Sequence, residues 1–416
     1  MIQAIEALNY RCLRSVRQGI SDFQVLVGAN ASGKSTFLDV IRFLGSLVGR
    51  GLEEAVRQRT DNLQDLTWQR RGGGFELAVE VRIPNSQRTA LPNQSAAHET
   101  CRYEVAIGID RSSQENAIQA ERVLLLTPRP GAPAQRELFP AESRVPSTIL
   151  ASIPARGVKT LINKVPGGND NFYDETGKGW DHAFRLGARK SALANLPEDE
   201  SRFPVSTWLK RLLIDGIETL ILNSLLMRKP SPPGLPKRFR PDGSNLPWAI
   251  EELQKNPDRF RQWLAHVRTA LPDVRTVETI ERPEDKHRYL VVVYETGLKA
   301  PSWTVSDGTL RLLALTLVAY LGQPGRIYLI EEPENGIHPR AIETVFQSLS
   351  SAYESQILCA THSPVILSLA EPKQILCFAR TSSGSTDIVP GNEHPNLRDW
   401  QRGTDLGTLF ATGVLG

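Results

Sequence analysis

The sequence has no long hydrophobic run and no recognisable export signal. Its longest strongly apolar run, Leu312–Leu321, is about half as long as the roughly twenty residues that a membrane-spanning helix needs. The first ten residues lack the basic region and apolar core of a secretory signal. We therefore expect neither an integral membrane protein nor a secreted one, and we expect a cytoplasmic location.

Cysteine is scarce, with four residues in 416. Cys12, Cys101, Cys359 and Cys377 lie far apart, and none belongs to a CxxC pair. This pattern argues against structural zinc and against a disulfide framework, and it fits a reducing compartment.

Neither sign of charge dominates, because 49 basic residues face 46 acidic ones. With 40% hydrophobic and 23% charged residues, the composition is that of an ordinary globular protein. The length predicts several domains or one large interrupted domain. One segment departs from the balance: Met227–Pro241 has five basic residues and no acidic one, namely Arg228, Lys229, Lys237, Arg238 and Arg240. It suits either phosphate contacts with DNA or a solvated, proline-stiffened linker.

Hydrophobic periodicity gives a coarse map of the chain. The strands that it predicts are 2–8, 23–27, 75–83, 101–110, 117–126, 288–294, 327–330, 356–360 and 374–378. The helices that it predicts begin at Lys34 and cover 205–213, 248–270, 310–321 and 338–353. Two proline-rich stretches, 127–146 and 229–247, are expected to be surface loops or linkers. In the last third of the chain strands alternate with helices, which indicates a largely parallel sheet.

The segment Gly28–Ser35, GANASGKS, is a P-loop between an apolar strand and an amphipathic helix. Glycines let backbone N–H groups turn inward around phosphate oxygens, at the positive end of the helix. Lys34 is expected to reach the β- and γ-phosphates and Ser35 to bind Mg²⁺. A chance match is the alternative, and the strand–helix context argues against it. The other expected nucleotide contacts are Gly28, Asn30, Ser32 and Gly33 in this segment and Thr36 directly after it.

A second motif, Tyr328–Glu334, is a buried strand that ends in adjacent carboxylates. Glu331 and Glu332 alone would be solvated charges at a strand end. Beside a P-loop, one carboxylate can hold a hydrated metal ion and the other can orient or deprotonate water.

Three further motifs are ambiguous when taken singly. Val305–Thr309 contains the tripeptide SDG, which is usually a helix cap or a turn. Glu334–Pro339, ENGIHP, is a turn into a helix, and Thr361–Pro364, THSP, follows a strand. A single histidine in such a place is usually structural.

In this order the five motifs resemble the nucleotide-binding head of ABC-type ATPases. More narrowly they resemble the RecF/OLD/SMC-like branch, a kind of AAA-family ATPase found in bacterial defence loci. The resemblance implies an α/β fold: a P-loop mixed sheet flanked by helices, with an antiparallel β lobe and a mixed helical insert. It divides the chain into a discontinuous nucleotide-binding domain, 1–126 and 275–416, and an insert, 127–274.

The resemblance also assigns residues. Ser306 and Gly308 match the signature motif, Asn335 the D-loop and His362 the switch histidine. Glu331 matches the Walker B residue, which would bind the metal ion together with Ser35, and Glu332 matches the catalytic glutamate. Lys34 and His362 join Glu332 as catalytic residues. The signature reads SDGT instead of SGGQ, and Glu331 stands where transporter ATPases have aspartate; both variants are typical of the OLD-like branch.

Two assignments stay open. Gln69 is the candidate Q-loop residue and metal ligand, with Gln64 as the alternative. Arg11 is either a basic residue near the nucleotide base or an ordinary surface arginine.

The function implied is an ATPase that uses ATP and Mg²⁺ and closes as a homodimer around two nucleotides. It would gate a partner effector, a nuclease or toxin acting in trans, in anti-phage defence. The alternative is a RecF-like repair or recombination ATPase that clamps DNA directly. A nucleotide-locked scaffold is a third reading, against which Glu332 and His362 argue. No long heptad run supports an SMC-type coiled coil, and we expect no Toprim nuclease domain after His362, because residues 363–416 are too few for one.

Overall fold

The computed structural model describes residues 1–92, 95, 97–127, 145–165, 167–235, 238–322, 324–352 and 354–394. The chain forms two compact units. Unit 1 comprises Met1–Ser21, Asn30–Ile217 and Ala379–Ile388, and unit 2 comprises Asp22–Ala29, Glu218–Phe378 and Val389–Gly416. The predicted insert, 127–274, thus belongs to unit 1 up to Ile217 and to unit 2 from Glu218. Lys237 and most of the first proline-rich stretch lie outside the described residues.

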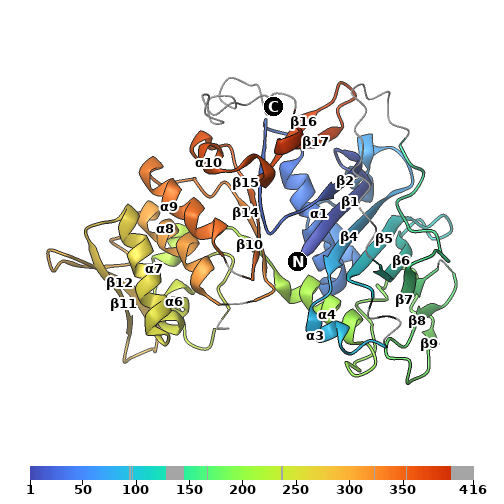
Figure 1. Cartoon of the computed structure of the whole chain (residues 1–416), viewed down its shortest axis with the longest axis horizontal. Helices are drawn as coiled ribbons and strands as arrows, with labels where there is room; N and C mark the ends of the chain where they lie inside the picture. The colour runs from blue at the N-terminus through green and yellow to red at the C-terminus, as the bar shows by residue number, and fades with distance from the viewer. Residues whose placement is uncertain are drawn as a thin grey trace. The chain divides into compact units, whose positions relative to one another are not determined.

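Unit 1 is built on an eight-stranded sheet whose neighbouring strands all pair antiparallel, in the order β2-β1-β4-β5-β6-β7-β8-β9. Its strands are β1 (Ile2–Tyr10), β2 (Leu13–Gly19), β4 (Gly74–Arg82), β5 (Thr100–Ile109), β6 (Asn116–Leu126), β7 (Val158–Lys164), β8 (Asp170–Phe172) and β9 (His182–Phe184). The predicted strands 2–8, 75–83, 101–110 and 117–126 are confirmed as β1, β4, β5 and β6. Figure 1 shows this sheet in blue to green, and it is the expected antiparallel lobe.

Helix α1 (Lys34–Arg50) packs on β1 and β4 of this sheet. The apolar side chains predicted to share one face of the helix are all buried: Phe37, Val40, Ile41, Leu44 and Val48. Unit 1 also contains α2 (Leu52–Arg57), α3 (Asn85–Arg88), α4 (Pro204–Arg211), a π-turn at Leu212–Gly216 and 3-10 turns at Leu63–Leu66 and Trp68–Arg70. Burying one face of α1 fixes the orientation of its first turn, which carries Lys34 and Ser35.

The second large sheet has the order β10-β14-β15-β3-β16-β17. Its strands are β10 (Ile217–Leu220), β14 (Ile327–Glu331), β15 (Gln356–Ala360), β3 (Phe23–Gly28), β16 (Ile375–Arg380) and β17 (Thr386–Pro390). The β14–β15, β15–β3 and β3–β16 pairs are parallel, as the strand–helix alternation predicts. Strands buried on both faces read as continuous apolar runs, and β14 and β15 do so.

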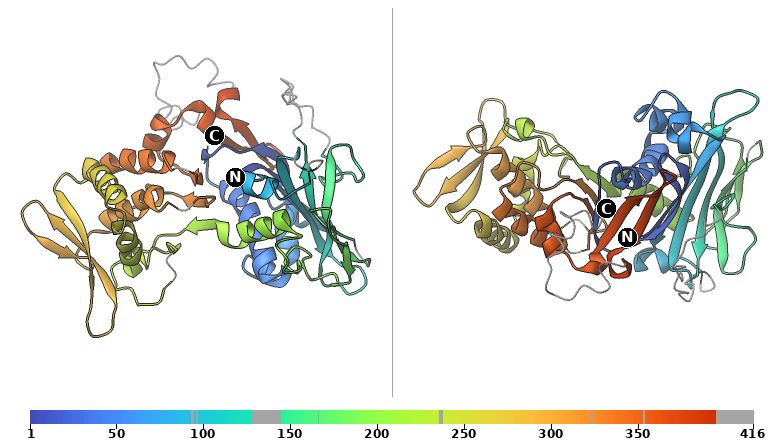
Figure 2. Two further views of the ribbon diagram at one scale, coloured as in Figure 1. Left: turned by 60° about the horizontal axis from the view of Figure 1, so that its bottom comes forward. Right: turned by 90° about the horizontal axis from the view of Figure 1, so that it is seen from above.

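The helices of unit 2 are α5 (Ser224–Met227), α6 (Leu246–Gln254), α7 (Pro257–Ala270), α8 (Asp307–Leu317), α9 (Pro339–Ser350) and α10 (Pro364–Leu369), with 3-10 turns at Val318–Tyr320, Pro372–Gln374 and Gly391–Glu393. A separate antiparallel sheet of β11 (Val274–Glu281), β12 (Arg288–Tyr294) and β13 (Lys299–Pro301) packs against α6 and α7. Figure 2 shows this small sheet beside those two helices in both views. No helix in the described ranges is both long and apolar enough to cross a membrane.

One element prediction is wrong: 248–270 is not a single helix. The chain leaves the helical conformation at Asn256, whose φ is −112° and ψ 93°, and starts again at Pro257. Proline cannot donate the backbone hydrogen bond that a continuous helix needs there, and it disfavours helical backbone at the residue before it. The Asn256 side chain instead accepts a hydrogen bond from the Arg259 N–H at 3.1 Å, which caps α7.

Candidate active site

The P-loop joins β3 to α1 through backbone conformations that favour glycine. Gly28 has φ 148° and Gly33 φ 109°, and Ala31 between them has φ 62°. Gly33 is the N-cap residue of α1 and provides no side-chain cap for the first turn. The helix therefore begins without the hydroxyl or carboxylate that usually satisfies its N-terminal N–H groups, an arrangement suited to an anionic ligand.

Thr386 of β17 braces this loop, a role that the sequence did not reveal. Its hydroxyl donates a hydrogen bond to the Ser32 carbonyl oxygen at 2.9 Å, and its N–H bonds to the Cys12 carbonyl oxygen at 2.9 Å. A Cβ atom at Gly33 would collide with the Thr386 hydroxyl, so a glycine is required there by packing as well as by its φ.

Two P-loop side chains are buried in a way that suits a phosphate ligand. The Ser32 hydroxyl is buried and has no hydrogen-bond partner among the described residues. Lys34 is only 7% exposed, which is unusual for lysine. Ser35 and Thr36 follow in the first turn of α1. A buried hydroxyl without a partner and a buried ammonium group fit the phosphates of a nucleotide.

The parallel strands of unit 2 bring three motifs to one edge. Glu331, the last residue of β14, pairs in register with Ala360, the last residue of β15, and Ala360 pairs with Leu26 of β3. The residues that follow these strands are Glu332, Thr361 with His362, and Gly28 with the start of the P-loop. The carboxyl edge of a parallel sheet is the usual place for a ligand site in such folds.

Glu332 is exposed at this edge and held by backbone and side-chain contacts. Its φ is 49°, and its N–H donates to the Ala360 carbonyl oxygen at 2.8 Å. The Asn335 side-chain amide donates to Glu332 Oε2, and the Asn335 N–H bonds to the Glu332 carbonyl oxygen at 3.0 Å. Asn335, expected to contact nucleotide, thus orients the expected catalytic carboxylate in its own chain.

Glu334 reaches the loop that carries His362. Its Oε1 accepts hydrogen bonds from the Thr361 hydroxyl at 2.7 Å and from the His362 N–H at 3.0 Å. Sequence reasoning quoted Glu334 in the motif but gave it no role. The sequence offered only one sign of a role for Glu334, namely its position three residues after Glu331 in the same motif.

The signature segment begins α8 with Ser306 as N-cap residue. The Ser306 hydroxyl accepts a hydrogen bond from the Thr309 N–H at 3.2 Å, and Ser306 itself is exposed. Gly308 lies against the D-loop, because a Cβ atom there would be 2.7 Å from the Gly336 carbonyl oxygen. The structure therefore brings the signature and D-loop segments together within unit 2.

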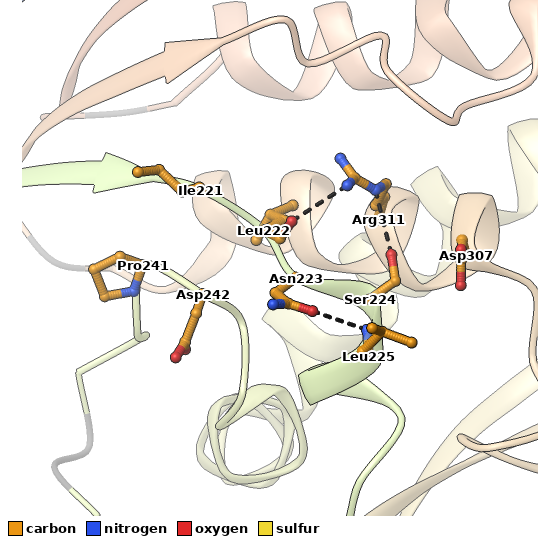
Figure 3. Close-up of a pocket in the computed structure, with 9 residues that line it drawn as sticks. All are labelled: Ile221, Leu222, Asn223, Ser224, Leu225, Pro241, Asp242, Asp307 and Arg311. Atoms are coloured by element: carbon orange, nitrogen blue, oxygen red, sulfur yellow. Dashed lines mark hydrogen bonds between the residues drawn. The ribbon is translucent and has the colours of Figure 1, made fainter.

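A strap comprising residues 222–228 holds α8 from two sides. From α8, Arg311 donates to the Leu222 carbonyl oxygen at 3.2 Å and to the Ser224 hydroxyl at 3.3 Å, as Figure 3 shows. From the strap, Arg228 bonds the Val305 carbonyl oxygen at 2.9 Å and pairs with Asp307 at 2.8 Å. Strap and helix line a cavity of about 590 Å³ together with Ile221, Pro241 and Asp242.

Other cations of the basic segment also have internal partners. Arg238 pairs with the buried Glu218 at 2.6 Å, and Arg240 lies 3.5 Å from Asp242. Three of the five basic residues, counting Arg228, therefore pair with acidic groups that lie outside the segment.

Arg11 and Gln69 both belong to unit 1. Arg11 lies in the turn between β1 and β2, and its guanidinium is 3.6 Å from Asp39 of α1. Burial opposes ionisation of Asp39, but hydrogen bonds and charge from Arg59, at 2.7 Å, outweigh it and lower the pKa of the carboxyl. Gln69 is exposed in the 3-10 turn at Trp68–Arg70, with φ 53°, and Gln64 is exposed in the turn before it.

No group of three or more His, Cys, Asp or Glu side chains in the described ranges forms a ready metal site, and all four cysteines are free thiols. Mg²⁺ with a nucleotide usually needs only one or two protein ligands, because phosphate oxygens and water complete its shell. A serine hydroxyl, as at Ser35, and a carboxylate, as at Glu331, are each donors of the kind that Mg²⁺ accepts.

The P-loop, the carboxylates and histidine at one sheet edge, and the signature helix define an ABC-type P-loop ATPase. The model of the family described as "AAA domain, putative AbiEii toxin, Type IV TA system" matches residues 23–368, well over half of the chain. The chain belongs to this family. No curated protein sequence matches it.

Solved structures with the same fold include SMC heads. One is the SMC head bound to the C-terminal winged-helix domain of ScpA, with 16% identity, a TM-score of 0.50, and coverage of 93% of this chain and 97% of that one. Another is the Pyrococcus furiosus SMC head with an extended coiled coil bound to the C-terminal domain of ScpA, with 13% identity, a TM-score of 0.51, and coverage of 93% and 95%. The chain therefore has the mixed α/β ABC-ATPase fold that the motifs predict.

Proposed function

We propose that this protein is a Mg²⁺-dependent ATPase that closes as a homodimer around two ATP molecules. Closure would gate a partner effector, a nuclease or toxin, in anti-phage defence. The observation that carries the proposal is the shared edge of β3, β15 and β14. The P-loop starts there after β3, and His362 and Glu332 follow β15 and β14.

In this proposal each residue has one task. Backbone N–H groups of the P-loop and the ammonium of Lys34 bind the phosphates, and the Ser32 hydroxyl offers a further hydrogen bond. Glu332 takes the proton of the attacking water while Asn335 holds its carboxylate in place. His362 donates a hydrogen bond to the terminal phosphate. Ser35 and Glu331, with Gln69 as a third candidate, would hold Mg²⁺, which supplies charge neutralisation when bound.

The signature helix supports a composite site. Ser306 and Asp307 at the start of α8 are exposed, and a helix N-terminus attracts an anion. In the proposed dimer that anion is the terminal phosphate bound by the P-loop of the other subunit. Hydrolysis would then require association, and ATP binding would drive closure.

Two findings support a partner protein. The family description includes a toxin–antitoxin system, and the SMC heads of similar fold were solved bound to ScpA. The alternative, direct clamping of DNA by the basic segment, has less support. Three of its five cations are engaged in ion pairs within the fold.

Glu332→Gln tests the chemistry. The amide keeps the shape of the side chain but cannot accept the proton, so ATP should bind and persist while turnover falls on the order of 100-fold or more. Turnover is measured by phosphate release, and the mass of the ATP-bound protein by light scattering. Lys34→Ala is the matched variant, which should lose nucleotide binding as well. Near wild-type turnover in either variant would overturn the site. If Glu331→Gln spares Mg²⁺ affinity and Glu332→Gln abolishes it, the two carboxylates exchange roles.

A further inference from the structure

Glu334 joins two loops that the proposed reaction uses. It lies between Glu332 and Asn335 along the chain, in the turn that follows β14. Its Oε1 is bound by the Thr361 hydroxyl and by the His362 N–H, both from the loop after β15. One carboxylate oxygen therefore holds the start of the histidine loop with two hydrogen bonds.

The same loop is tied to the strand that leads into the P-loop. The Thr361 N–H donates to the Leu26 carbonyl oxygen of β3 at 3.1 Å, and the Thr361 hydroxyl accepts from the Ser363 N–H at 2.9 Å. Thr361 is fully buried. Its hydroxyl donates its single proton to Glu334, so Glu334 fixes how the whole turn Thr361–Ser363 is oriented.

The second oxygen of Glu334 makes the arrangement unusual. Oε2 is buried and has no hydrogen-bond partner among the described residues, a situation that costs free energy of about 1–3 kcal/mol. Burial, and after it the charge of Glu334, raise the pKa of the Cys359 thiol on β15. The Glu334 carboxylate thus lies close to β15 as well as to the histidine loop. Because a buried oxygen without a partner costs free energy, we expect the hydrogen bonds of Glu334 to serve more than folding.

We infer that Glu334 is a positioning residue that sets His362 relative to Glu332. Because Asn335 orients the Glu332 carboxylate and the neighbouring Glu334 orients the His362 loop, the short turn after β14 places both groups together. This inference rests on the proposed ATPase function and adds a residue that acts through His362. In this inference Glu334 itself contacts neither the nucleotide nor the attacking water.

The test compares two substitutions at Glu334. Glu334→Gln keeps Oε1 as acceptor and changes only the oxygen that has no partner, so turnover should stay within a few-fold of wild type. Glu334→Ala removes both hydrogen bonds to the loop, and turnover should fall about 10- to 100-fold with nucleotide affinity unchanged, as expected for a misplaced catalytic group. Glu343→Ala is the matched control, because Glu343 is an exposed glutamate on α9 of the same unit.

A double-mutant cycle with His362→Ala identifies the route of the effect. If Glu334 acts through His362, Glu334→Ala should cause little further loss in the His362→Ala background. The ring signal of His362 in the NMR spectrum should move in Glu334→Ala and stay in place in Glu343→Ala. Thr361→Val, which removes one of the two donors, should give a smaller loss of turnover and provides the comparison if Glu334→Ala does not fold.

Three outcomes would overturn the inference: equal losses in both backgrounds, an unmoved His362 signal, or a Glu334→Gln variant that loses affinity for Mn²⁺. The last would make Glu334 a metal ligand instead. Failure of the proposed function looks different, since the wild-type protein itself would then show no ATP turnover.

Discussion

Close packing gives a second reason for glycine at two positions that the sequence motifs assign to nucleotide binding. Gly308 lies so near the Gly336 carbonyl oxygen that any side chain would push the signature and D-loop segments apart. A Cβ atom at Gly33 would instead collide with the side chain of Thr386. At both positions an added side chain would displace neighbouring groups even without a bound nucleotide. Packing and ligand binding therefore make the same demand on these residues.

Glu175 carries a prediction about pH. Its carboxyl accepts hydrogen bonds from the N–H groups of Val205 at 2.6 Å and Ser206 at 3.0 Å, at the start of α4. Burial outweighs these bonds and raises the pKa of Glu175 to about 7, from an ordinary 4.5. The folded state binds the Glu175 proton more tightly than the unfolded state does. The resulting stabilisation of the folded state is therefore complete below pH 4.5 and is lost as pH rises through 7. The loss amounts to about 3 kcal/mol.

The measurement is the melting temperature of wild type and Glu175→Gln between pH 5 and pH 8. The wild-type value should fall over this range by more than the value of the variant, because glutamine cannot lose a proton. Other buried carboxyls contribute to both curves, so only the difference counts. Parallel curves for the two proteins would contradict the prediction.

Among the elements, α8 is held in position by contacts with a segment far from it in the sequence. Arg228 of the strap contacts Val305 and Asp307 at the start of the helix, and Arg311 of the helix contacts Ser224 of the strap. The Ser302 hydroxyl adds a hydrogen bond to the Arg228 carbonyl oxygen at 2.9 Å. The basic segment Met227–Pro241 was predicted to be a linker or a DNA contact, but its first residues hold the signature motif in place.

Arg228→Ala should therefore impair the signature segment. Without the guanidinium, the Val305 carbonyl oxygen and Asp307 lose their partner, and the uncompensated charge of Asp307 would repel an incoming phosphate. We expect turnover to fall several-fold while ATP binding to the P-loop persists, as measured by phosphate release and by binding of a fluorescent nucleotide. Lys229→Ala is the control, since Lys229 is its exposed neighbour. Equal effects of the two substitutions would argue for a general role of positive charge, including DNA contact.

For the whole molecule, the proposed dimer predicts how the rate depends on concentration. If each site needs the signature of a second subunit, ATP turnover per subunit should rise with protein concentration and level off once dimers dominate. Ser306→Arg, which places bulk and charge at the exposed N-cap, should abolish this rise while leaving nucleotide binding largely intact. A constant rate per subunit at dilutions where light scattering detects only monomer would sink the composite site.

The sequence determined the five motifs and the elements that carry them. A glycine-rich loop after an apolar strand, an amphipathic helix from Lys34 and adjacent carboxylates after a buried strand are local patterns, so neighbouring residues suffice to predict them. The break at Asn256 was equally local, and the Asn–Pro pair was the signal for it.

Only the tertiary structure decided which distant residues meet. Thr386 lies far along the chain from Ser32, Glu334 from His362 and Arg228 from Asp307, and no spacing rule relates such pairs. The parallel pairing of β14 and β15 brings Glu334 to His362, the place of β17 in the sheet brings Thr386 to the P-loop, and the path of the strap brings Arg228 to Asp307. Sequence patterns report the faces and ends of single elements, whereas these contacts depend on how sheets and helices pack, which is why the supporting residues stayed hidden.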